Sequence, residues 1–517
     1  MLLPFFSLVF GTAAVGVGAD YVNQTTCNGK TYTYQELAGY GAFSGNATDK
    51  FGDTVGGMGS SIAIDRQQWK KLDNGSYSGV LWALPDRGWN TEGTLNFQPR
   101  VHKFKIILTP QPDATVVNPS GNNLDLIYED TIRFSGPDGT PCTGLDADGS
   151  GHLSYPGFPD LPVATYTGDG FGNSGSGGKR VPVDSEGIFL NPDGTFWVSD
   201  EYGPYIYRFN QSGTMIQAIR PNDAIIPMRH KVESFSADSP PFYDNNGDDV
   251  SPADNPTGRD NNHGFEGLTI TADGQYLYAL LQAAANQEGG LGKQTERYAR
   301  LVRFNISDAS DALYDGEYVV PLPLYDDPTA KASKNPKVAA QSEIFHVAGT
   351  QFLVLARDSG AGHGADSSTS VYRHADVFDI AAATDVQGAT YDCTTCAIAS
   401  SDGVLDADIT PAAYCSFLDF NVEDQLNRFG VHNGGDQDAS LLNEKWESLA
   451  MVPVDGDQGA DGQWFLFSLS DNDFITQHGS LDGGAFTYAD SSGYNLDNQA
   501  LVFQVTLPQG SSPYSPS

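Results

Sequence analysis

A hairpin that recurs along the chain constrains the fold more than any other feature. In the clearest copy, residues 184–203, two apolar runs flank an Asn-Pro-Asp-Gly turn, which is typical of two antiparallel strands. Four similar hairpins occur elsewhere, and a polar residue stands just before the first strand of every copy: Ser60, Glu186, Glu266, Glu343 and Glu447. Five copies of one unit indicate an internal repeat.

Further strand-like segments follow each hairpin, with no helical stretches between the units. Four-stranded antiparallel units in series predict an all-β fold, a β-propeller. Five blades are recognisable, and the loop insertions at about 134–183 and 386–442 are long enough to hold further units, so we expect five to seven. A third insertion spans about 225–262. A stack of β-sandwiches is the alternative, but it does not explain the repeated polar residue.

The last repeat, which starts at Trp446, supplies only three strands of its own. The alternating, aromatic-rich segment at residues 31–43 is therefore expected to add the fourth strand and to close the ring. A short helix is expected within residues 416–429, inside the last insertion.

The two ends of the chain indicate a secreted protein. Residues 1–19 are apolar and end in small residues, which predicts a signal peptide, with a buried N-terminal strand as the alternative. Residues 20–510 would then form a single domain, and residues 511–517 a disordered tail. Five Asn-x-Ser/Thr sequons predict a glycoprotein: Asn23, Asn46, Asn74, Asn210 and Asn305.

The net charge narrows the range of partners. The chain has 65 acidic and 28 basic residues, which gives a formal net charge of −37. Nucleic acids and anionic membranes bind basic surfaces, so we expect neither as a partner. We expect a soluble, extracellular monomer, and the acidic excess favours the binding of divalent cations.

Five cysteines are present, and an oxidising compartment favours their pairing. We expect Cys396 to pair with Cys415 and Cys27 to pair with Cys142, which leaves Cys393 over. The Cys393-x-x-Cys396 spacing also matches redox and zinc motifs, but the sequence has no second such motif and no βαβ pattern around it.

The repeated polar residues are expected to meet at one end of the propeller channel. In a hairpin, the start of the first strand and the end of the second lie at the same end. Carboxylates gathered there would raise one another's pKa and would favour a divalent cation, Ca²⁺ above all. The candidates are Glu186, Glu266, Glu343, Glu447, Asp86, Asp200, Asp358 and Asp471 or Asp473. The alternative is that each carboxylate caps its own blade by accepting backbone N–H bonds.

Basic side chains follow the same pattern. Arg87 and Arg357 each lie at the end of a second strand, where a guanidinium would bind an anionic substrate such as a phosphate ester. The alternative for both is a salt bridge to the carboxylates. His263 and His363 are candidate acid–base or substrate-binding groups, or else loop residues. The sequence has no Gly-x-Ser-x-Gly motif, so serine-based hydrolysis is not favoured.

Several strings also resemble a known family. DSEGIFLNPDGTFWVSDEYGPYIYRF, GFEGLTITADGQYLYALLQ, KWESLAMVP and LFSLSDNDF resemble the phytase-like domain described as "esterase-like activity of phytase", over about residues 56–473. The string PGFPDLPVATYTGDGFG is similar to its secreted fungal branch. The resemblance implies a propeller whose repeated acidic residues are the active groups, here Glu186, Asp200, Glu266, Glu343 and Glu447. Ser60 departs from that pattern.

These observations predict a secreted, metal-dependent hydrolase that acts on the ester or phosphoester bonds of a small molecule. One alternative is a calcium-dependent propeller similar to lactonases or arylesterases. The other is a non-catalytic extracellular binding propeller. A basic pocket beside the carboxylates would favour a phosphoester, an apolar pocket would favour a lactone or aryl ester, and no pocket would favour binding alone.

Overall fold

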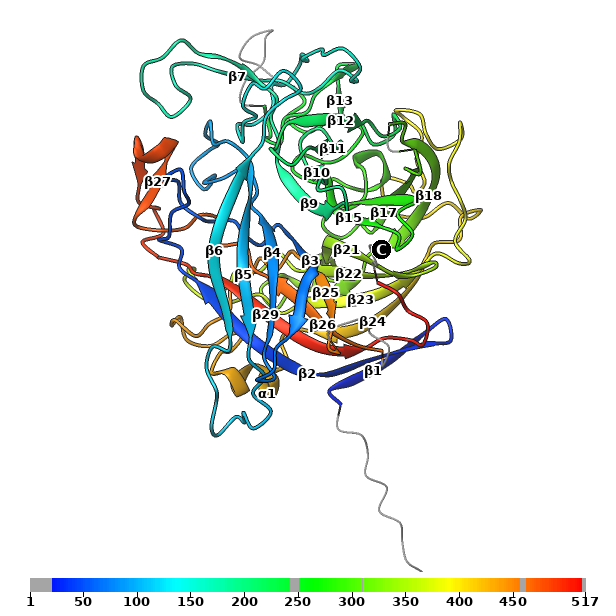
Figure 1. The fold of residues 1–517 in the computed structure, drawn as a ribbon. Coiled ribbons are helices and arrows are strands. Elements are labelled where there is room, and N and C mark those ends of the chain that lie inside the picture. The colour runs from blue at the N-terminus through cyan, green and yellow to red at the C-terminus, as the bar shows by residue number, and fades with distance from the viewer. Residues whose placement is uncertain (1–20, 242–250, 309, 456–461, 514–517) are drawn as a thin grey trace, which may run out of the picture.

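The computed structural model describes residues 21–241, 251–308, 310–455 and 462–513. Five antiparallel sheets are arranged around one axis as the blades of a β-propeller (Figure 1), so the predicted fold class is confirmed at the low end of the expected range. The predicted signal peptide, 1–19, lies outside the described residues. Of the predicted tail, residues 511–513 are described, and the carbonyl of Pro513 accepts a hydrogen bond from Arg66 at 2.7 Å, so this part is packed.

Each of the first four blades is formed by four strands that are consecutive in the sequence. Blade 1 contains β3 (Ser61–Lys71), β4 (Tyr77–Leu84), β5 (Arg100–Leu108) and β6 (Leu124–Arg133). Blade 2 contains β9 (Ser185–Leu190), β10 (Phe196–Asp200), β11 (Ile206–Phe209) and β12 (Met215–Ile219). Blade 3 contains β15 (Phe265–Ile270), β16 (Tyr276–Leu281), β17 (Tyr298–Asn305) and β18 (Leu313–Pro321). Blade 4 contains β21 (Ala340–Ala348), β22 (Gln351–Arg357), β23 (Arg373–Asp379) and β24 (Ala413–Asp419).

Blade 5 joins the two ends of the chain, as the strand count predicts. Its C-terminal strands are β25 (Ala450–Pro453), β26 (Gln463–Leu469) and β29 (Asn498–Thr506), and β29 pairs with the N-terminal strand β2 (Lys30–Phe43). A fifth strand, β1 (Asn23–Cys27), was not expected; it pairs with β2 at the outer edge. Pairing of the first strands with the last removes the open edges that a linear array of blades would leave.

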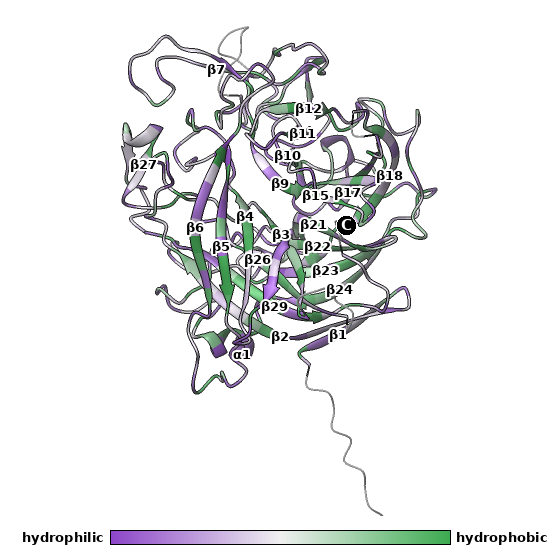
Figure 2. Cartoon of the chain, viewed as in Figure 1, coloured by the Kyte–Doolittle hydropathy of each residue, from purple (hydrophilic) through white to green (hydrophobic). Residues whose placement is uncertain are grey.

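The hairpin turns follow from their residues. In blade 2 the carboxylate of Asp193 accepts a hydrogen bond from the backbone N–H of Thr195 at 2.9 Å, and Gly194 has a φ of 79°. An Asp-Gly pair tolerates this left-handed turn where most residues do not. Hydrophobic residues lie mostly on the strands of the blades, and the loops between strands are largely hydrophilic (Figure 2).

Aliphatic side chains fill the axial channel over most of its length. They come from the innermost strands β3, β9, β15, β21 and β25, and from the residue just before β25: Ile62, Ile64, Ile188, Leu268, Ile344, Leu449 and Met451. The remaining cavity is about 40 Å³, close to the space of a single water molecule. The channel is therefore a packed core; polar side chains that also line this cavity include Glu343.

The insertions hold small elements and no further blade within their described residues. The first carries β7 (Ala164–Tyr166) and β8 (Gly178–Arg180), and the second carries β13 (Met228–Arg229) and β14 (Val232–Glu233). The predicted boundary of the third, 386–442, is wrong, because it contains β24, the outer strand of blade 4. The predicted short helix is present as α1 (Glu423–Leu426) with the 3-10 turn η3 (Asn427–Phe429).

The remaining elements lie in loops: β19 (Leu324–Tyr325), β20 (Lys337–Val338), β27 (Gly479–Leu481), β28 (Phe486–Tyr488), and the 3-10 turns η1 (Asn286–Glu288), η2 (Ala332–Lys334) and η4 (Asp482–Gly484). Among the described residues, none of the helices has the length and apolar character that crossing a bilayer requires.

Both predicted disulfides are wrong in their pairing. Cys27 bonds to Cys415, because β1 lies beside the edge strand β24 of blade 4; Thr25 donates a hydrogen bond to the carbonyl of Ser416 there. Cys142 is buried as a free thiol in the apolar core beside blade 2. That core is separate from the one that contains Cys27.

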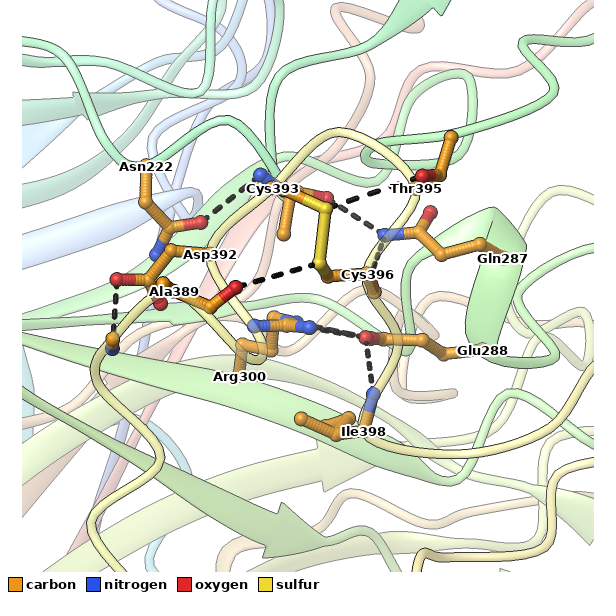
Figure 3. Close-up of a disulfide and its surroundings, with 12 residues drawn as sticks. Asn222, Gln287, Glu288, Arg300, Ala389, Asp392, Cys393, Thr395, Cys396 and Ile398 are labelled. Atoms are coloured by element: carbon orange, nitrogen blue, oxygen red, sulfur yellow. Dashed lines mark hydrogen bonds and ion pairs between the residues drawn. A yellow bond between two sulfur atoms is a disulfide. The ribbon is translucent and has the colours of Figure 1, made fainter.

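The second disulfide joins Cys393 to Cys396 within one turn of the third insertion. Figure 3 shows it above the buried pair of Arg300 and Glu288, whose carboxylate also accepts the backbone N–H of Ile398 at 2.9 Å. The Cys-x-x-Cys spacing thus forms a local bridge that shapes the loop over blade 3.

Candidate metal and active site

The starts of the five inner strands form a ring of buried polar residues at one end of the channel. In each blade this position lies two residues before the first channel-lining aliphatic residue, and its occupants are Ser60, Glu186, Glu266, Ser342 and Glu447. All five are at most 5% exposed. The three glutamates influence one another electrostatically: Glu266 and Glu447 both raise the pKa of Glu186, after burial itself. These mutual effects on pKa support the predicted convergence of the three glutamates, which stays a prediction.

Glu343 does not belong to this ring, and its predicted place there is wrong. Glu343 directly precedes the channel-lining residue Ile344, whereas the ring residues stand two positions before theirs. Its position in the strand therefore corresponds to that of Gly187 and Gly267 in blades 2 and 3. Its carboxylate accepts hydrogen bonds from the Ser61 hydroxyl at 2.5 Å and from the backbone N–H of Leu268 at 3.1 Å. Burial raises its pKa, with no contribution from another charged group. Glu343 ties blades 1, 3 and 4 together and acts as the predicted alternative, a cap.

Asp200 and Asp358 also act as caps. Asp200 accepts the backbone N–H groups of Asp184 and Gly203 at 2.9 and 3.0 Å, together with the Tyr207 hydroxyl. Asp358 accepts the N–H groups of Gly360, Val371 and Tyr372 at 2.5–2.8 Å. A carboxylate has about four lone-pair positions, and these donors occupy three of them in Asp358 and, with the backbone N–H of Tyr202, all four in Asp200. Their geometry is that of a cap, the alternative to the predicted metal-binding or catalytic role.

A second group of carboxylates surrounds the ammonium of Lys445. The Nζ atom lies 2.7 Å from both Asp471 and Asp473 and 3.9 Å from Glu447. Asp86 lies with the two aspartates in one cluster whose ligand atoms are within 4.8 Å of one another. Burial raises the pKa of Asp471 to about 7 despite Lys445. Sequence reasoning missed Lys445, which directly precedes Trp446.

A third group consists of Asp184, Glu186 and Glu201. Among the described residues, Arg87 is the one basic side chain within 4.0 Å of its carboxylates. Its ligand atoms lie within 4.8 Å of one another, and all three residues are buried. Arg87 approaches Asp184 at 3.3 Å, yet Oδ2 of Asp184 and Oε1 of Glu201 have no hydrogen-bond partner among the described residues. Burial and the charge of Asp184 raise the pKa of Glu201 to about 8. We name this group the open acidic site.

The other ring glutamates differ in their surroundings. Oε1 of Glu266 accepts a hydrogen bond from Gln282, while its buried Oε2 has no partner among the described residues. Burial, Glu201 and Glu447 raise its pKa well above the ordinary value. Glu447 forms an ion pair with Arg357. Glu266 therefore keeps one buried oxygen without a partner among the described residues.

Arg87 and Arg357 both form salt bridges with carboxylates, which was the alternative to substrate binding. Each also has an N–H group without an acceptor among the described residues. Arg87 pairs with Asp184, and Arg357 pairs with Glu447. Their side chains are 17% and 16% exposed, and the Nε of each has no acceptor among the described residues. Both side chains are thus partly exposed, while their Nε atoms are buried.

The two histidines lie away from the carboxylate ring. His263 lies beside Asp260 and Lys293, and burial with Lys293 lowers its pKa well below the ordinary value. His363 lines a separate cavity with Asp438, and its ring packs edge-on against Tyr494. Neither histidine contacts a ring glutamate, so the prediction of acid–base roles has no geometric support.

The five sequon asparagines lie at the surface. Asn23, Asn46 and Asn74 are exposed, and Asn210 and Asn305 are partly exposed in tight turns. Glycosylation at these positions stays a prediction.

Residues that sequence reasoning missed carry much of the site. Asp184 lies two residues before Glu186 on the same face of the strand, and Glu201 follows Asp200. Because side chains two residues apart in an extended segment lie on the same face, the position of Glu186 is a signal that could have identified Asp184 as a site residue. For the Asp200-Glu201 pair, the register irregularity between Ser199 and Asp200 decides which carboxylate reaches the site, and the sequence gives no signal of it.

Comparison with known proteins places this site in a family. The family described as "Phytase-like: Esterase-like activity of phytase" matches residues 54–474, a segment that contains every residue of the ring. A relative from Arthroderma benhamiae, named "Uncharacterized secreted protein", is 53% identical over 465 residues, which covers 89% of this chain and 90% of the relative.

Solved structures resemble the chain only weakly. A luciferin-regenerating enzyme is 11% identical, with a TM-score of 0.28 over 89% of this chain and 95% of that one. An N-acetylgalactosamine deacetylase from F. plautii is 11% identical, with a TM-score of 0.33 over 91% of this chain and 95% of that one. The family match and the fungal relative agree with the ring of acidic residues: the chain belongs to the phytase-like family, whose described activity is the esterase-like activity of phytase.

Proposed function

We propose that this chain is a secreted hydrolase of ester or phosphoester bonds that depends on a divalent cation. The observation that carries the proposal is the excess of buried carboxyl groups over basic groups at the end of the channel. The open acidic site contains three buried carboxyl groups, and one oxygen of Asp184 and one of Glu201 have no hydrogen-bond partner among the described residues. Among those residues, Arg87 is the one basic side chain within ion-pair distance of the group. Family membership and the secreted relative support a hydrolase outside the cell.

The residues fit a hard cation. Asp184, Glu186 and Glu201 would hold it, because carboxylate oxygens suit Ca²⁺ and Mg²⁺, and a cation would offset the repulsion within the group. The Lys445 group is a poorer candidate, because an ammonium already occupies it. When bound, a divalent cation supplies Lewis acidity to an ester or phosphoryl oxygen and lowers the pKa of water.

The protein's own side chains would perform the remaining work. Arg87 and Arg357 are each partly exposed and would bind the anionic part of a substrate through the exposed part of the guanidinium. Glu266, with a free buried oxygen beside the open acidic site, would serve as the general base. Gln282 donates to its other oxygen and would hold the carboxylate in place.

These partly exposed basic side chains favour a phosphoester or another anionic ester over a lactone or neutral aryl ester, since the latter require an apolar pocket. The binding-propeller alternative does not account for buried carboxyl oxygens without partners, which are costly unless they have a ligand.

The test is a hydrolase panel on the secreted protein. Phosphomonoesters, phytate, aryl esters and lactones would be compared with and without chelator, and with Ca²⁺ or Mg²⁺ added back. We expect hydrolysis of an anionic ester that chelator abolishes and cation restores. E266Q is expected to lose activity while it keeps the cation-dependent rise in Tm. Activity that is insensitive to chelator would overturn the metal dependence, and no hydrolysis on the whole panel would favour the binding propeller.

A further inference from the structure

A second polar cavity lies on the rim of the propeller, and no residue of the ring lines it. Its volume is about 410 Å³, within the usual range for small-molecule sites. Three separate parts of the chain form it: the ends of β5 and β6 at Arg100 and Arg133, the first insertion around Tyr166–Arg180, and the turn η4. It is therefore a product of the tertiary fold.

Two arginines face this cavity without a carboxylate partner. Within the described parts of the chain, neither Arg133 nor Arg180 has a carboxylate oxygen within 4.0 Å, whereas Arg100 pairs with Asp49 and Asp53 at 2.7 and 2.8 Å. The Arg133 guanidinium lies 3.8 Å from the ring centre of Phe51, and that of Arg180 lies 5.3 Å from Tyr166. A guanidinium over a ring has its plane fixed while its N–H edges stay free for a bidentate acceptor.

The acidic residues of the cavity are largely engaged elsewhere. Asp53 accepts the N–H of Gly483 in addition to its ion pair with Arg100. Asp169 accepts the backbone N–H groups of Phe171 and Asn173, 2.8 and 3.0 Å away, within its own loop. Asp482 is exposed at the rim. The lining therefore offers carboxylates at longer range, but among the described residues none forms an ion pair with Arg133 or Arg180.

The wall of the cavity is fixed in place. The Asn96 side chain donates to the carbonyl of Asp169 and accepts from the Thr143 hydroxyl, both at 2.9 Å. A Cβ added to Gly170 would lie 2.5 Å from Cβ of Asn96, so the backbone of the first insertion at Gly170 packs directly against Asn96. A preformed cavity loses little conformational entropy when a ligand binds.

We propose that this rim cavity binds the oxyanion group, a phosphate or a carboxylate, of a small ligand. Arg133 and Arg180 hold the oxyanion by charge-assisted hydrogen bonds, and Asp482 accepts a hydroxyl of the same ligand at the rim. The site is independent of the carboxylate ring, and it needs no metal ion.

The experiment is calorimetric titration of the full secreted protein in chelator, which removes any contribution from a cation in the ring. Two probes are used separately, inorganic phosphate and glucuronate. We expect saturable binding of at least one; phosphate alone identifies a phosphate ligand, glucuronate alone a carboxylate ligand, and both identify recognition of the shared oxyanion. R133Q and R180Q are each expected to weaken binding tenfold or more.

K179Q is the matched control, because Lys179 neighbours Arg180 on β8, is exposed and does not line the cavity. It removes the same charge and is expected to change affinity less than twofold. R133K and R180K keep the charge but lose the planar pair of donors, so intermediate affinities are expected. Failure of both probes to bind, or equal affinity in the parent and both Gln variants, would overturn the proposal without bearing on the hydrolase.

Discussion

The Nζ atom of Lys445 lies 2.7 Å from Oδ2 of Asp471 at the end of the axial channel. The Lys445 ammonium thus partly balances the negative charge of the group formed by Asp86, Asp471 and Asp473. The neighbouring group of Asp184, Glu186 and Glu201 has three carboxylates and no ammonium. Arg87 forms an ion pair with Asp184 there, but oxygens of Asp184 and Glu201 have no hydrogen-bond partner among the described residues, and we propose that a metal ion completes the balance of charge on that side.

Replacement of Lys445 by Met should unbalance the first group. Asp86, Asp471 and Asp473 would keep their shared position without the ammonium, and breaking a buried ion pair in this way costs about 3–5 kcal/mol. We expect a lower Tm in chelator, and a larger rise with added Ca²⁺ than in the parent, because a second cation site is created. Thermal melting with and without Ca²⁺ measures both effects. K179M, an exposed lysine outside the ring, is the control, and a K445M protein that melts like the parent would contradict the account.

Glu186→Gln and Glu201→Gln should weaken cation binding. Each keeps the shape of the side chain and removes one charge from the open acidic site. A ligand at 100 times its Kd stabilises the folded state by about 2.7 kcal/mol, so the parent should melt at a higher temperature as Ca²⁺ is added. Each variant should need at least about tenfold more Ca²⁺ for the same shift, which corresponds to about 1.4 kcal/mol.

Glu343→Gln is the matched control for these two variants. Glu343 is as buried as Glu186 and lies at the start of the equivalent strand, but it contacts Ser61 and backbone groups and does not face the cluster. We expect E343Q to alter Tm while it keeps the parent's Ca²⁺ concentration dependence. If E343Q lost the response and E186Q kept it, the assignment of the site would be reversed.

Stability in chelator should depend on pH in an unusual direction. Burial raises the pKa of Glu201 to about 8 and that of Asp471 to about 7, from ordinary values of 4.5 and 3.8. The folded state then holds protons that the unfolded state has released, so the free energy of unfolding falls as the pH rises from about 5 to about 8. Added Ca²⁺ should restore more stability at the upper end of this range. Melting curves at several pH values measure this, and a Tm in chelator that rises between pH 5 and pH 8 would show that these groups are not protonated in the folded state.

The fold could be predicted from the sequence because each repeat carries its own local signals for strands and turns. Hairpin turns and alternating apolar residues recur in every blade, and a last blade one strand short requires a strand from the other end of the chain. The outer strand β24 was missed because a long loop separates it from the rest of blade 4. The unexpected strand β1 lies at a sheet edge, where its place depends on contacts with another blade.

The site could be predicted only at the level of its chemistry. The acidic ring is visible as a repeated glutamate, but Glu343 differs from Glu186 by one residue of register, which moves it to another level of the channel. Asp200 and Glu201 are adjacent, and the local irregularity of the strand directs Asp200 toward backbone donors. A one-residue shift in a strand reverses which face a side chain occupies, so composition and motif alone cannot separate a cap from a ligand.

The disulfide between Cys27 and Cys415 should be the main covalent support of the closed ring. It ties the outermost strand of blade 5 to the outer strand of blade 4 and spans 388 residues of sequence, whereas the bridge of Cys393 and Cys396 spans three. Because a long loop loses more entropy when it is closed, removal of the first bridge should cost about 2–5 kcal/mol. We therefore expect the C27S/C415S variant to melt at a clearly lower temperature and to expose β1 to proteolysis. The C393S/C396S variant, with the same number of cysteines replaced, should melt close to the parent. Equal melting of the two double variants would mean that strand pairing between β2 and β29 closes the ring without covalent help.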